Sequence, residues 1–154
     1  MLKNYFCFFS VLLFTGPVFA DCTSIKDNDQ RQYCYATTKN SKSNCTSIKN
    51  NDLRYRCYAE TDYNKNSCTS IRDNDQRFYC YAKTGNNKNS CTSIKNNDLR
   101  QRCYGETGNS SNSCSGIRDN DQRFYCYAIT KHSKNSCTSI RNNDLRNQCY
   151  EKTK

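Results

Sequence analysis

The sequence predicts an all-α protein built from six tandem helical hairpins, and three observations carry this prediction. Twelve cysteines recur at strict spacing, a stripe of fixed residues at helical spacing surrounds the second cysteine of each copy, and residues typical of helix caps precede each predicted helix. Copies of constant length form repeat arrays in which each unit buries its weak core against its neighbours. We therefore expect a short solenoid stapled by disulfides.

The repeat has a period of 23 residues without exception. Within each copy, Ile holds the fourth place, Asn and Asp the seventh and eighth, Arg the tenth, Tyr the fourteenth and Thr the seventeenth. A loose polar linker, such as KNSKSN, follows the Thr. The copies begin at Cys22, Cys45, Cys68, Cys91, Cys114 and Cys137, and the second cysteine of each is Cys34, Cys57, Cys80, Cys103, Cys126 and Cys149.

Each copy is interpreted as two short helices. The first cysteine and the Ile are three residues apart, so they share one face of a first helix that Asn89 and Ser90, or their equivalents, would cap. Asn28 and Asp29, with their counterparts, mark the start of a second helix, and Asp suits the positive end of its dipole. The tenth, thirteenth, fourteenth and seventeenth places then form a helical stripe. Gly85 and Gly108 are typical helix terminators.

A β structure is the competing interpretation. Phe78, Tyr79 and Tyr81 around Cys80 have good strand propensity. Strict alternation of apolar and polar residues is missing, however, and the caps are well placed for helices, so helical hairpins are favoured. The copy at Cys114 reads CSGI in place of CTSI, which is expected to weaken its first helix.

The copies alternate between two versions, so the true unit is a pair of 46 residues. Odd copies read DNDQR, and even copies read NNDLR, with Leu at the ninth place: Leu53, Leu99 and Leu145. An apolar residue in place of Gln predicts that the even units bury a face that the odd units expose.

The first twenty residues predict export. Lys3 precedes an apolar stretch, and small residues at Val18 and Ala20 indicate a secretory signal peptide cleaved before Asp21. The stretch is too short to span a bilayer, which needs roughly 20 apolar residues. We expect a mature repeat domain over 21–154 with no membrane span, exported to the periplasm or beyond.

Twelve cysteines remain after Cys7 leaves with the signal peptide, an even number that predicts a disulfide framework in an oxidising compartment. Pairing the two cysteines of each copy uses all twelve, whereas pairing each copy to the next leaves Cys22 and Cys149 without partners. Pairing within copies is therefore favoured, at about 3 kcal/mol for a loop of this size in the chain-entropy model. Zinc sites prefer closer cysteines and often histidine, so we expect neither a metal nor a cofactor.

The twelfth place carries the candidate binding surface. Tyr and Arg are enriched at binding hot spots, and they alternate there as Tyr33, Arg56, Tyr79, Arg102 and Tyr125. The alternative is that this alternation only sets the packing register between neighbouring units, and that alternative is the more favoured one.

The eighth and tenth places are interpreted as structural. Two residues apart on a helix, their side chains point in different directions, so each would pair with a neighbouring unit or cap a helix end. A ladder of ion pairs fits this array better than a catalytic site. The residues are Asp29, Arg31, Asp52, Arg54, Asp75, Arg77, Asp98, Arg100, Asp121, Arg123, Asp144 and Arg146.

The sequence shows no recognisable enzyme site. His132 is the single histidine and falls in a variable linker, and every mature cysteine has a structural partner, which leaves no thiol nucleophile. The DND of the odd copies is similar to the start of a calcium loop but lacks the glycine and the terminal Glu of an EF-hand.

The pattern Cys-x2-Ile-x3-Asp-x-Arg-x2-Cys resembles repeats of small exported bacterial proteins, and the resemblance covers 21–154. It implies an exported, disulfide-stapled array and no particular activity. We expect a protein-binding module of the bacterial envelope, such as an inhibitor or immunity factor whose partner is another exported protein. The net charge of the mature chain, about +9 from 23 basic and 14 acidic residues once Lys3 is removed, leaves a polyanion binder as the alternative. A passive structural protein of the envelope is the third possibility.

Overall fold

The computed structural model describes residues 21–62, 64–108 and 110–154, and the described residues contain helices and no strand. The predicted signal peptide lies outside them. None of the described helices has the length and apolar character needed to cross a bilayer. The six longer helices are α1 (Asn28–Lys39), α3 (Asn51–Thr61), α4 (Asn74–Gly85), α5 (Asn97–Gly108), α7 (Asn120–Lys131) and α8 (Asn143–Lys152).

A short helix of three to six residues precedes each longer helix. Four of these are 3₁₀ helices and two are short α-helices. Each ends before the fourth-place Ile, which the sequence analysis had placed on this helix. The copy that reads CSGI still forms its turn. These short helices are η1 (Cys22–Ser24), α2 (Lys42–Cys45), η2 (Lys65–Ser70), η3 (Lys88–Ser93), α6 (Ser111–Cys114) and η4 (Lys134–Ser139).

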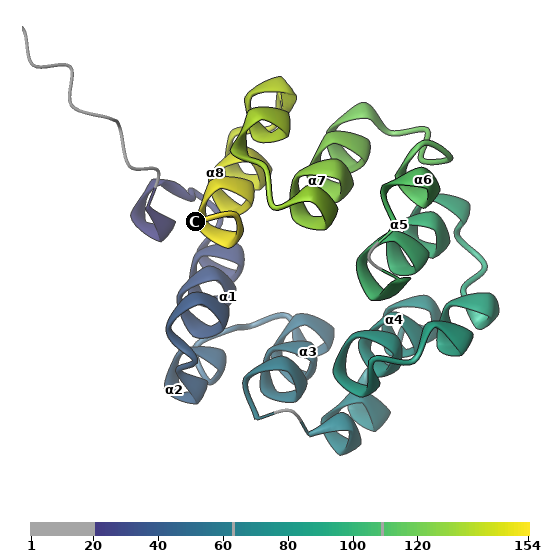
Figure 1. Ribbon diagram of the computed structural model, residues 1–154. Coiled ribbons are helices and arrows are strands. Elements are labelled where there is room, and N and C mark those ends of the chain that lie inside the picture. Colours follow the sequence, from purple (N-terminus) through teal and green to yellow (C-terminus); the bar gives the residue numbers. More distant parts are fainter. Residues whose placement is uncertain (1–20, 63, 109) are drawn as a thin grey trace, which may run out of the picture.

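The array of hairpins closes into a ring (Figure 1). The long helices stand side by side around a circle with the short helices outside them, and the last helix, α8, packs against α1 and η1. Asp144 accepts hydrogen bonds from the backbone N–H groups of Lys26 and Asp27 at 2.9 and 3.0 Å. Asp29 makes the same two bonds to Lys49 and Asn50. The junction between the ends of the chain therefore repeats an internal junction, and the predicted solenoid is closed.

Each unit is locked by its own disulfide, which confirms the pairing within copies. All six bonds join cysteines twelve residues apart, with Cα atoms 5.6–5.7 Å apart. The six fourth-place isoleucines are at most 1% exposed. The seventeenth-place Thr, such as Thr61, donates to the carbonyl of the second cysteine and lies 3.8 Å from the sulfur of the first. The three fixed residue types thus form one small core per unit.

The long helices are capped one residue earlier than the sequence suggested. The sixth-place side chain is the cap: Asp27 accepts from the N–H of Gln30, and Asn50 accepts from that of Leu53. The seventh-place Asn instead accepts from the tenth-place Arg, as Asn28 does from Arg31. An Asx side chain at the residue just before the helix reaches the N–H three residues on, which leaves the next two residues for other partners.

The structure confirms some of the other predicted helix ends and corrects the rest. α4 and α5 do end at Gly85 and Gly108, but the left-handed residue after α4 is Asn86, with φ 45°. His132 takes the same conformation after α7 and is exposed, in agreement with a linker residue. Asn89 and Ser90 lie inside η3, which Asn87 caps. The first helices therefore begin earlier than expected.

Alternation appears in the interfaces between units and not in the exposure of the ninth place. Gln30 and Leu53 are both half-buried, so the prediction that only even units bury this face is wrong. The odd-to-even interface, by contrast, buries a tyrosine: Tyr33 packs with Ala36 and Ile48. Among the described residues, the even-to-odd interface between α3 and α4 has no buried tyrosine. The pair of 46 residues is thus the packing unit.

Removal of the Asp144 carboxylate is expected to open the ring. No linker crosses the junction between α8 and α1, so D144A leaves the ends held only by packing and by two side-chain hydrogen bonds from α8. We expect a loss of about 1–2 kcal/mol, near the lower limit for bonds to a charged group because solvent reaches the site. In hydrogen exchange, the first and last units should lose protection while the central units keep theirs. D75A removes the same bonds inside the chain, where the linker holds the units together, and should cause only local change. Equal exchange in the two variants would contradict closure.

Candidate functional site

The inside of the ring is lined by three places of the repeat, the ninth, twelfth and sixteenth. They are three and four residues apart, so they lie on one face of each long helix. The ninth-place layer lies nearest the helix starts, at the end of the ring that we call the mouth. The twelfth-place layer lies in the middle, and the sixteenth-place layer lies beyond it. Side chains on this face come from six helices and meet around the axis of the ring.

The predicted Tyr and Arg stripe forms the middle layer, and the structure places all five residues together. The Arg56 guanidinium carbon lies 5.3 and 4.7 Å from the ring centroids of Tyr33 and Tyr79. Arg102 lies 5.6 and 4.5 Å from those of Tyr79 and Tyr125. Cation–π contact of this kind is stronger when desolvated. The layer therefore reads Tyr, Arg, Tyr, Arg, Tyr around the axis.

These five residues, the candidate binding surface of the sequence analysis, face the inside of the ring. The three tyrosines are at most 4% exposed, and the side chains of Arg56 and Arg102 are 15% and 14% exposed. A closed ring turns one face of every long helix toward its axis, and the twelfth place lies on that face. Packing between neighbouring units, the alternative interpretation, agrees with this burial.

Two carboxylates of the sixteenth-place layer neutralise the arginines. Glu106 lies 2.6 Å from Arg102 Nε, 3.0 Å from Lys83 Nζ and 2.6 Å from the hydroxyl that Tyr79 donates. Its side chain is only 3% exposed. Glu60 repeats the arrangement with Arg56 at 2.8 Å and the Tyr33 hydroxyl at 2.5 Å. These are two buried networks of charge-assisted hydrogen bonds.

The environment of each network favours the ionised carboxylate and the neutral phenol. Burial alone raises the pKa of Glu60, but Arg56, Lys152 and the Tyr33 hydroxyl outweigh it and lower the pKa to about 2. The pKa of Glu106 is lowered in the same way by Arg102 and Lys83 against its burial. Burial raises the pKa of Tyr79 well above its usual value despite the nearby Arg102. The interior groups are thus held in fixed charge states.

The third pair of units departs from this pattern. Its twelfth place is Gln148 and its sixteenth place is Lys152, where the other pairs carry Arg and Glu. Lys152 Nζ lies 5.2 Å from the Tyr33 ring centroid and 4.0 Å from Glu60, so a lysine closes the circle of cations over tyrosines. The sixteenth-place layer and the two arginines together carry four cations and two carboxylates. The interior therefore has a surplus of positive charge.

A cavity with three lobes opens at the mouth. The lobes have volumes of about 430, 500 and 470 Å³, and Arg56 lines all three. Neighbouring lobes share one sixth-place aspartate: Asp73 for the first and third, Asp119 for the first and second, and Asp27 for the second and third. The arginines form the floor of this cavity, and the helix caps form its rim.

The predicted structural role of the eighth-place aspartates is confirmed at every junction. Each carboxylate accepts two backbone N–H groups of the next unit, as Asp98 does from Arg118 and Asp119 at 3.0 Å. These bonds lower the pKa of Asp98. The tenth-place arginines serve their own unit: Arg77 donates to the carbonyl of Ile71 and to Asn74. Among the described residues no salt bridge joins the two places, so the ion-pair ladder is wrong.

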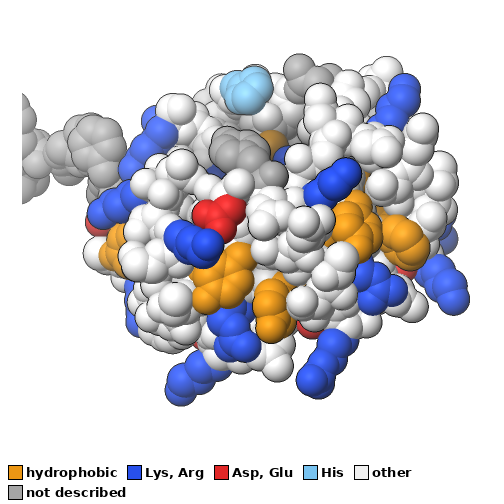
Figure 2. All heavy atoms as spheres, turned by 90° about the horizontal axis from the view of Figure 1, so that it is seen from below, with side chains coloured by type: hydrophobic (Ala, Val, Ile, Leu, Met, Phe, Trp, Pro, Cys, Tyr) orange, Lys and Arg blue, Asp and Glu red, His pale blue; other side chains and the backbone are white. Residues whose placement is uncertain are grey.

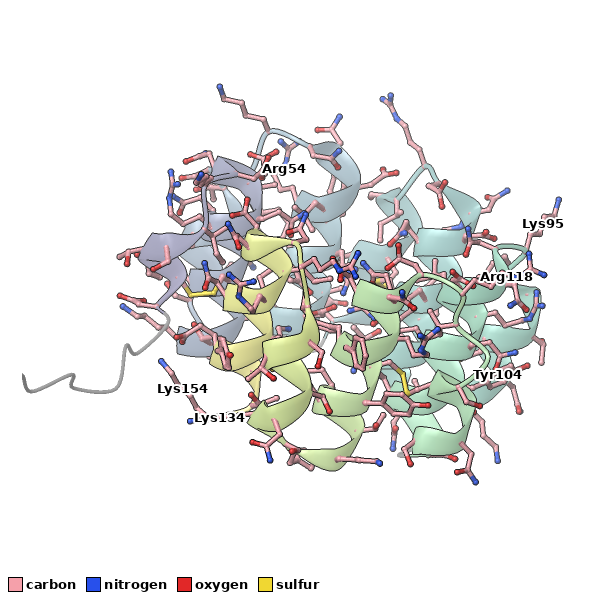
Figure 3. All side chains as sticks on the ribbon, turned by 90° about the horizontal axis from the view of Figure 1, so that it is seen from above. Arg54, Lys95, Tyr104, Arg118, Lys134 and Lys154 are labelled. Carbon is pink, nitrogen blue, oxygen red and sulfur yellow. A yellow bond between two sulfur atoms is a disulfide. The ribbon has the colours of Figure 1, made fainter. Side chains whose placement is uncertain are left out.

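A circle of basic side chains surrounds the mouth on the outside, and we call it the crown. The fifth place is Lys or Arg in every copy, directly before the helix caps, and all six residues are exposed. Figure 3 shows Lys95 near the mouth, whereas Lys134 lies toward the opposite end of the ring. The space-filling view in Figure 2 shows further Lys and Arg side chains over the wall of the ring. The crown consists of Lys26, Lys49, Arg72, Lys95, Arg118 and Arg141.

Sequence reasoning missed the sixteenth place and the crown. Glu60 and Glu106 follow Arg56 and Arg102 by four residues, a spacing that pairs opposite charges on a helix and could have revealed them. In the described residues one group has metal-ligand proximity, formed by Asp21, Cys22 and Glu151. The Cys22 sulfur is bound in a disulfide, so this group lacks a thiolate ligand.

The fold and its interior define a class of protein: a closed ring of six disulfide-stapled helical units with a charged polar axis. Six disulfides fit an oxidising, extracellular type of environment. Comparison of the chain with protein-family models, curated proteins and solved structures finds no match. The resemblance of the repeats to exported bacterial proteins therefore stays a prediction.

Proposed function

We propose that this protein is an exported, non-enzymatic binding module of the bacterial envelope, whose crown holds an acidic surface of another exported protein. The observation that carries the proposal is the crown itself, with one exposed cation at the same place of all six units. An inhibitor or an immunity factor is the kind of protein that would use such a face.

The rigidity of the ring supports this role. The crown residues lie in the loop before each helix cap, and Asp75 holds the backbone N–H groups of Lys95 and Asn96 at 2.8 Å. The equivalent bonds at the other five junctions fix the remaining loops. A preorganised surface loses little conformational entropy on binding, which favours affinity. Opposite charge on the partner would speed association.

A polyanion such as nucleic acid or an acidic cell-wall polymer is the second candidate, because the crown would attract it too. The rim of the cavity argues for the protein partner. Inside the crown lie Asp27, Asp73 and Asp119, whose charges oppose a polyanion that crosses the mouth. A folded partner can place its acidic side chains over the crown and leave the rim uncovered.

Capture from envelope extracts tests the proposal with charge-matched variants. The oxidised mature protein should retain an exported protein from the extract. The variant K26Q/K49Q/K95Q, which lacks three charges of the crown, should bind that protein about tenfold or more weakly. The control K65Q/K88Q/K134Q removes three exposed lysines at the short helices η2, η3 and η4, away from the crown, and should retain the partner. Equal capture by both variants would reject the crown. Capture of nucleic acid or polymer, weakening steeply with salt, would instead establish the second candidate.

A further inference from the structure

The second lobe of the mouth cavity has a positive floor and a negative rim. It is the lobe of about 500 Å³ that lies over the third pair of units, where Gln148 replaces an arginine. Arg56 and Arg102 line it from below, and Asp27 and Asp119 line it at the rim. A lobe of this size is in the range of small-molecule sites.

One arginine of the floor, Arg56, has hydrogen-bond donors that no described residue accepts, whereas the neighbouring floor residues use theirs. Arg102 Nη1 donates to Gln122 at 2.9 Å, and Gln148 Nε2 donates to Gln30 at 2.9 Å. The equivalent bond from Arg56 is absent: its Nε binds Glu60, while Nη1 and Nη2 donate to no other described residue. The floor also has one unused acceptor, because Oε1 of Gln148, a residue that is 9% exposed, accepts no hydrogen bond from the described residues. Two parallel N–H groups of a guanidinium match a carboxylate.

The rim offers acceptors of the opposite charge. Asp27 and Asp119 each use Oδ1 as a helix cap, at 2.8 Å from the N–H of Gln30 and Gln122. The Oδ2 of each accepts no hydrogen bond from a described residue. The eighth-place aspartates that also line the lobe, Asp121 and Asp144, differ because both of their oxygens hold backbone N–H groups. The free charge of the rim is therefore on the sixth place.

Apolar surface lies between the floor and the rim. Leu53 and Leu145 line the lobe at the ninth place, and Tyr33 and Tyr125 line it at the twelfth. An aliphatic side chain fits such walls. The lobe thus combines the three parts that an apolar α-amino acid would need: donors for a carboxylate, acceptors for an ammonium group and an apolar wall.

We propose that the second lobe binds a free apolar α-amino acid, with its carboxylate on Arg56 and its ammonium group on a rim carboxylate, that of Asp27 or Asp119. The site is independent of the crown and of the protein partner proposed above. A polyanion is disfavoured because the rim repels it, and a simple cation is disfavoured because the floor repels it. The zwitterion is the charge pattern that matches both.

Titration of the oxidised mature protein with leucine tests this site, followed by amide chemical shifts. Leucine should give saturable shifts around the mouth. N-acetyl-leucine lacks the ammonium charge and leucinamide lacks the carboxylate, so each should bind about tenfold or more weakly, the loss expected for one charged hydrogen-bonded contact. Absence of saturable shifts with leucine, or equal binding of the three compounds, would overturn the proposal.

The chain supplies its own matched variants. D27N/D119N keeps both helix caps, because Asn50 and Asn142 cap their helices in the native protein at 2.9 Å. This variant should bind leucine about tenfold more weakly and should no longer prefer leucine to N-acetyl-leucine. D73N changes the third rim aspartate, which does not line the second lobe, and should leave leucine binding nearly unchanged. Equal effects of D27N/D119N and D73N would refute the assignment.

The floor is tested with the variant R56Q/E60Q. The new glutamine at the twelfth place of the repeat is the residue that the third pair of units has naturally at that place. Removing Glu60 together with Arg56 avoids an unpaired buried carboxylate. This variant should lose leucine binding while the disulfides and the helical circular dichroism stay intact. Retained binding by the folded variant would overturn the role of Arg56, and if the variant does not fold, the rim variants still decide.

Discussion

Reduction of the six disulfides is expected to unfold the ring at neutral pH. Among the described residues, the fully buried large side chains are one tyrosine, Tyr79, and the six fourth-place isoleucines, which is little for a repeat domain of this length. A disulfide that closes a loop of this size contributes about 3 kcal/mol in the chain-entropy model. Six such contributions exceed the usual net stability of about 5–15 kcal/mol. The folded state of the reduced chain should therefore be the minor one.

Far-UV circular dichroism with and without a phosphine reductant measures the effect. The oxidised protein should show a cooperative thermal transition, and the reduced and alkylated protein should show neither the helical signal nor the transition. Alkylation without the reductant is the control and should modify no thiol. At smaller scale, C68S/C80S removes one staple and should lower the free energy of unfolding by about 2–5 kcal/mol. A reduced chain that keeps its helices would mean that burial alone holds the fold.

Substitution of Glu106 is expected to be the most damaging change to a single charge. Its carboxylate is the counter-charge of Arg102 and Lys83 and accepts the Tyr79 hydroxyl, in a site where it is 3% exposed. Removal of one partner of a buried pair costs about 3–5 kcal/mol, because the remaining charge stays buried without compensation. E106Q should lower the free energy of unfolding by this amount in urea titrations at pH 7.

Two comparisons identify the cause. R102M/E106M removes both charges, so it should recover much of the loss. In addition, the folded-state pKa of Glu106 lies below its ordinary value of 4.5, so its contribution is present above that pH and is lost as the pH falls toward the folded-state value. Wild-type stability should therefore decline below about pH 4.5 more steeply than that of E106Q. A double variant no more stable than E106Q, or parallel pH profiles, would contradict this account.

The candidate site was only partly predictable. The alternation of tyrosine and arginine at the twelfth place identified the residues that meet, but not that they meet inside, because whether a helix face is exposed depends on the curvature of the whole array. Glu106 was overlooked although its spacing from Arg102 was visible. The cap at Asp27 was placed one residue late, since Asp27, Asn28 and Asp29 are all suitable caps by type and only their contacts distinguish them.

The sequence by itself determined the units: their number, their length, their helical character and the disulfide inside each, because all of these depend on contacts within 23 residues. Closure was decided by the tertiary structure. The angle between consecutive units sums over six junctions, and a small change in that angle separates an open solenoid from a ring. Only when the ring closes does Asp144 meet Lys26, and only then do Arg56, Arg102 and Gln148 share one charged cavity.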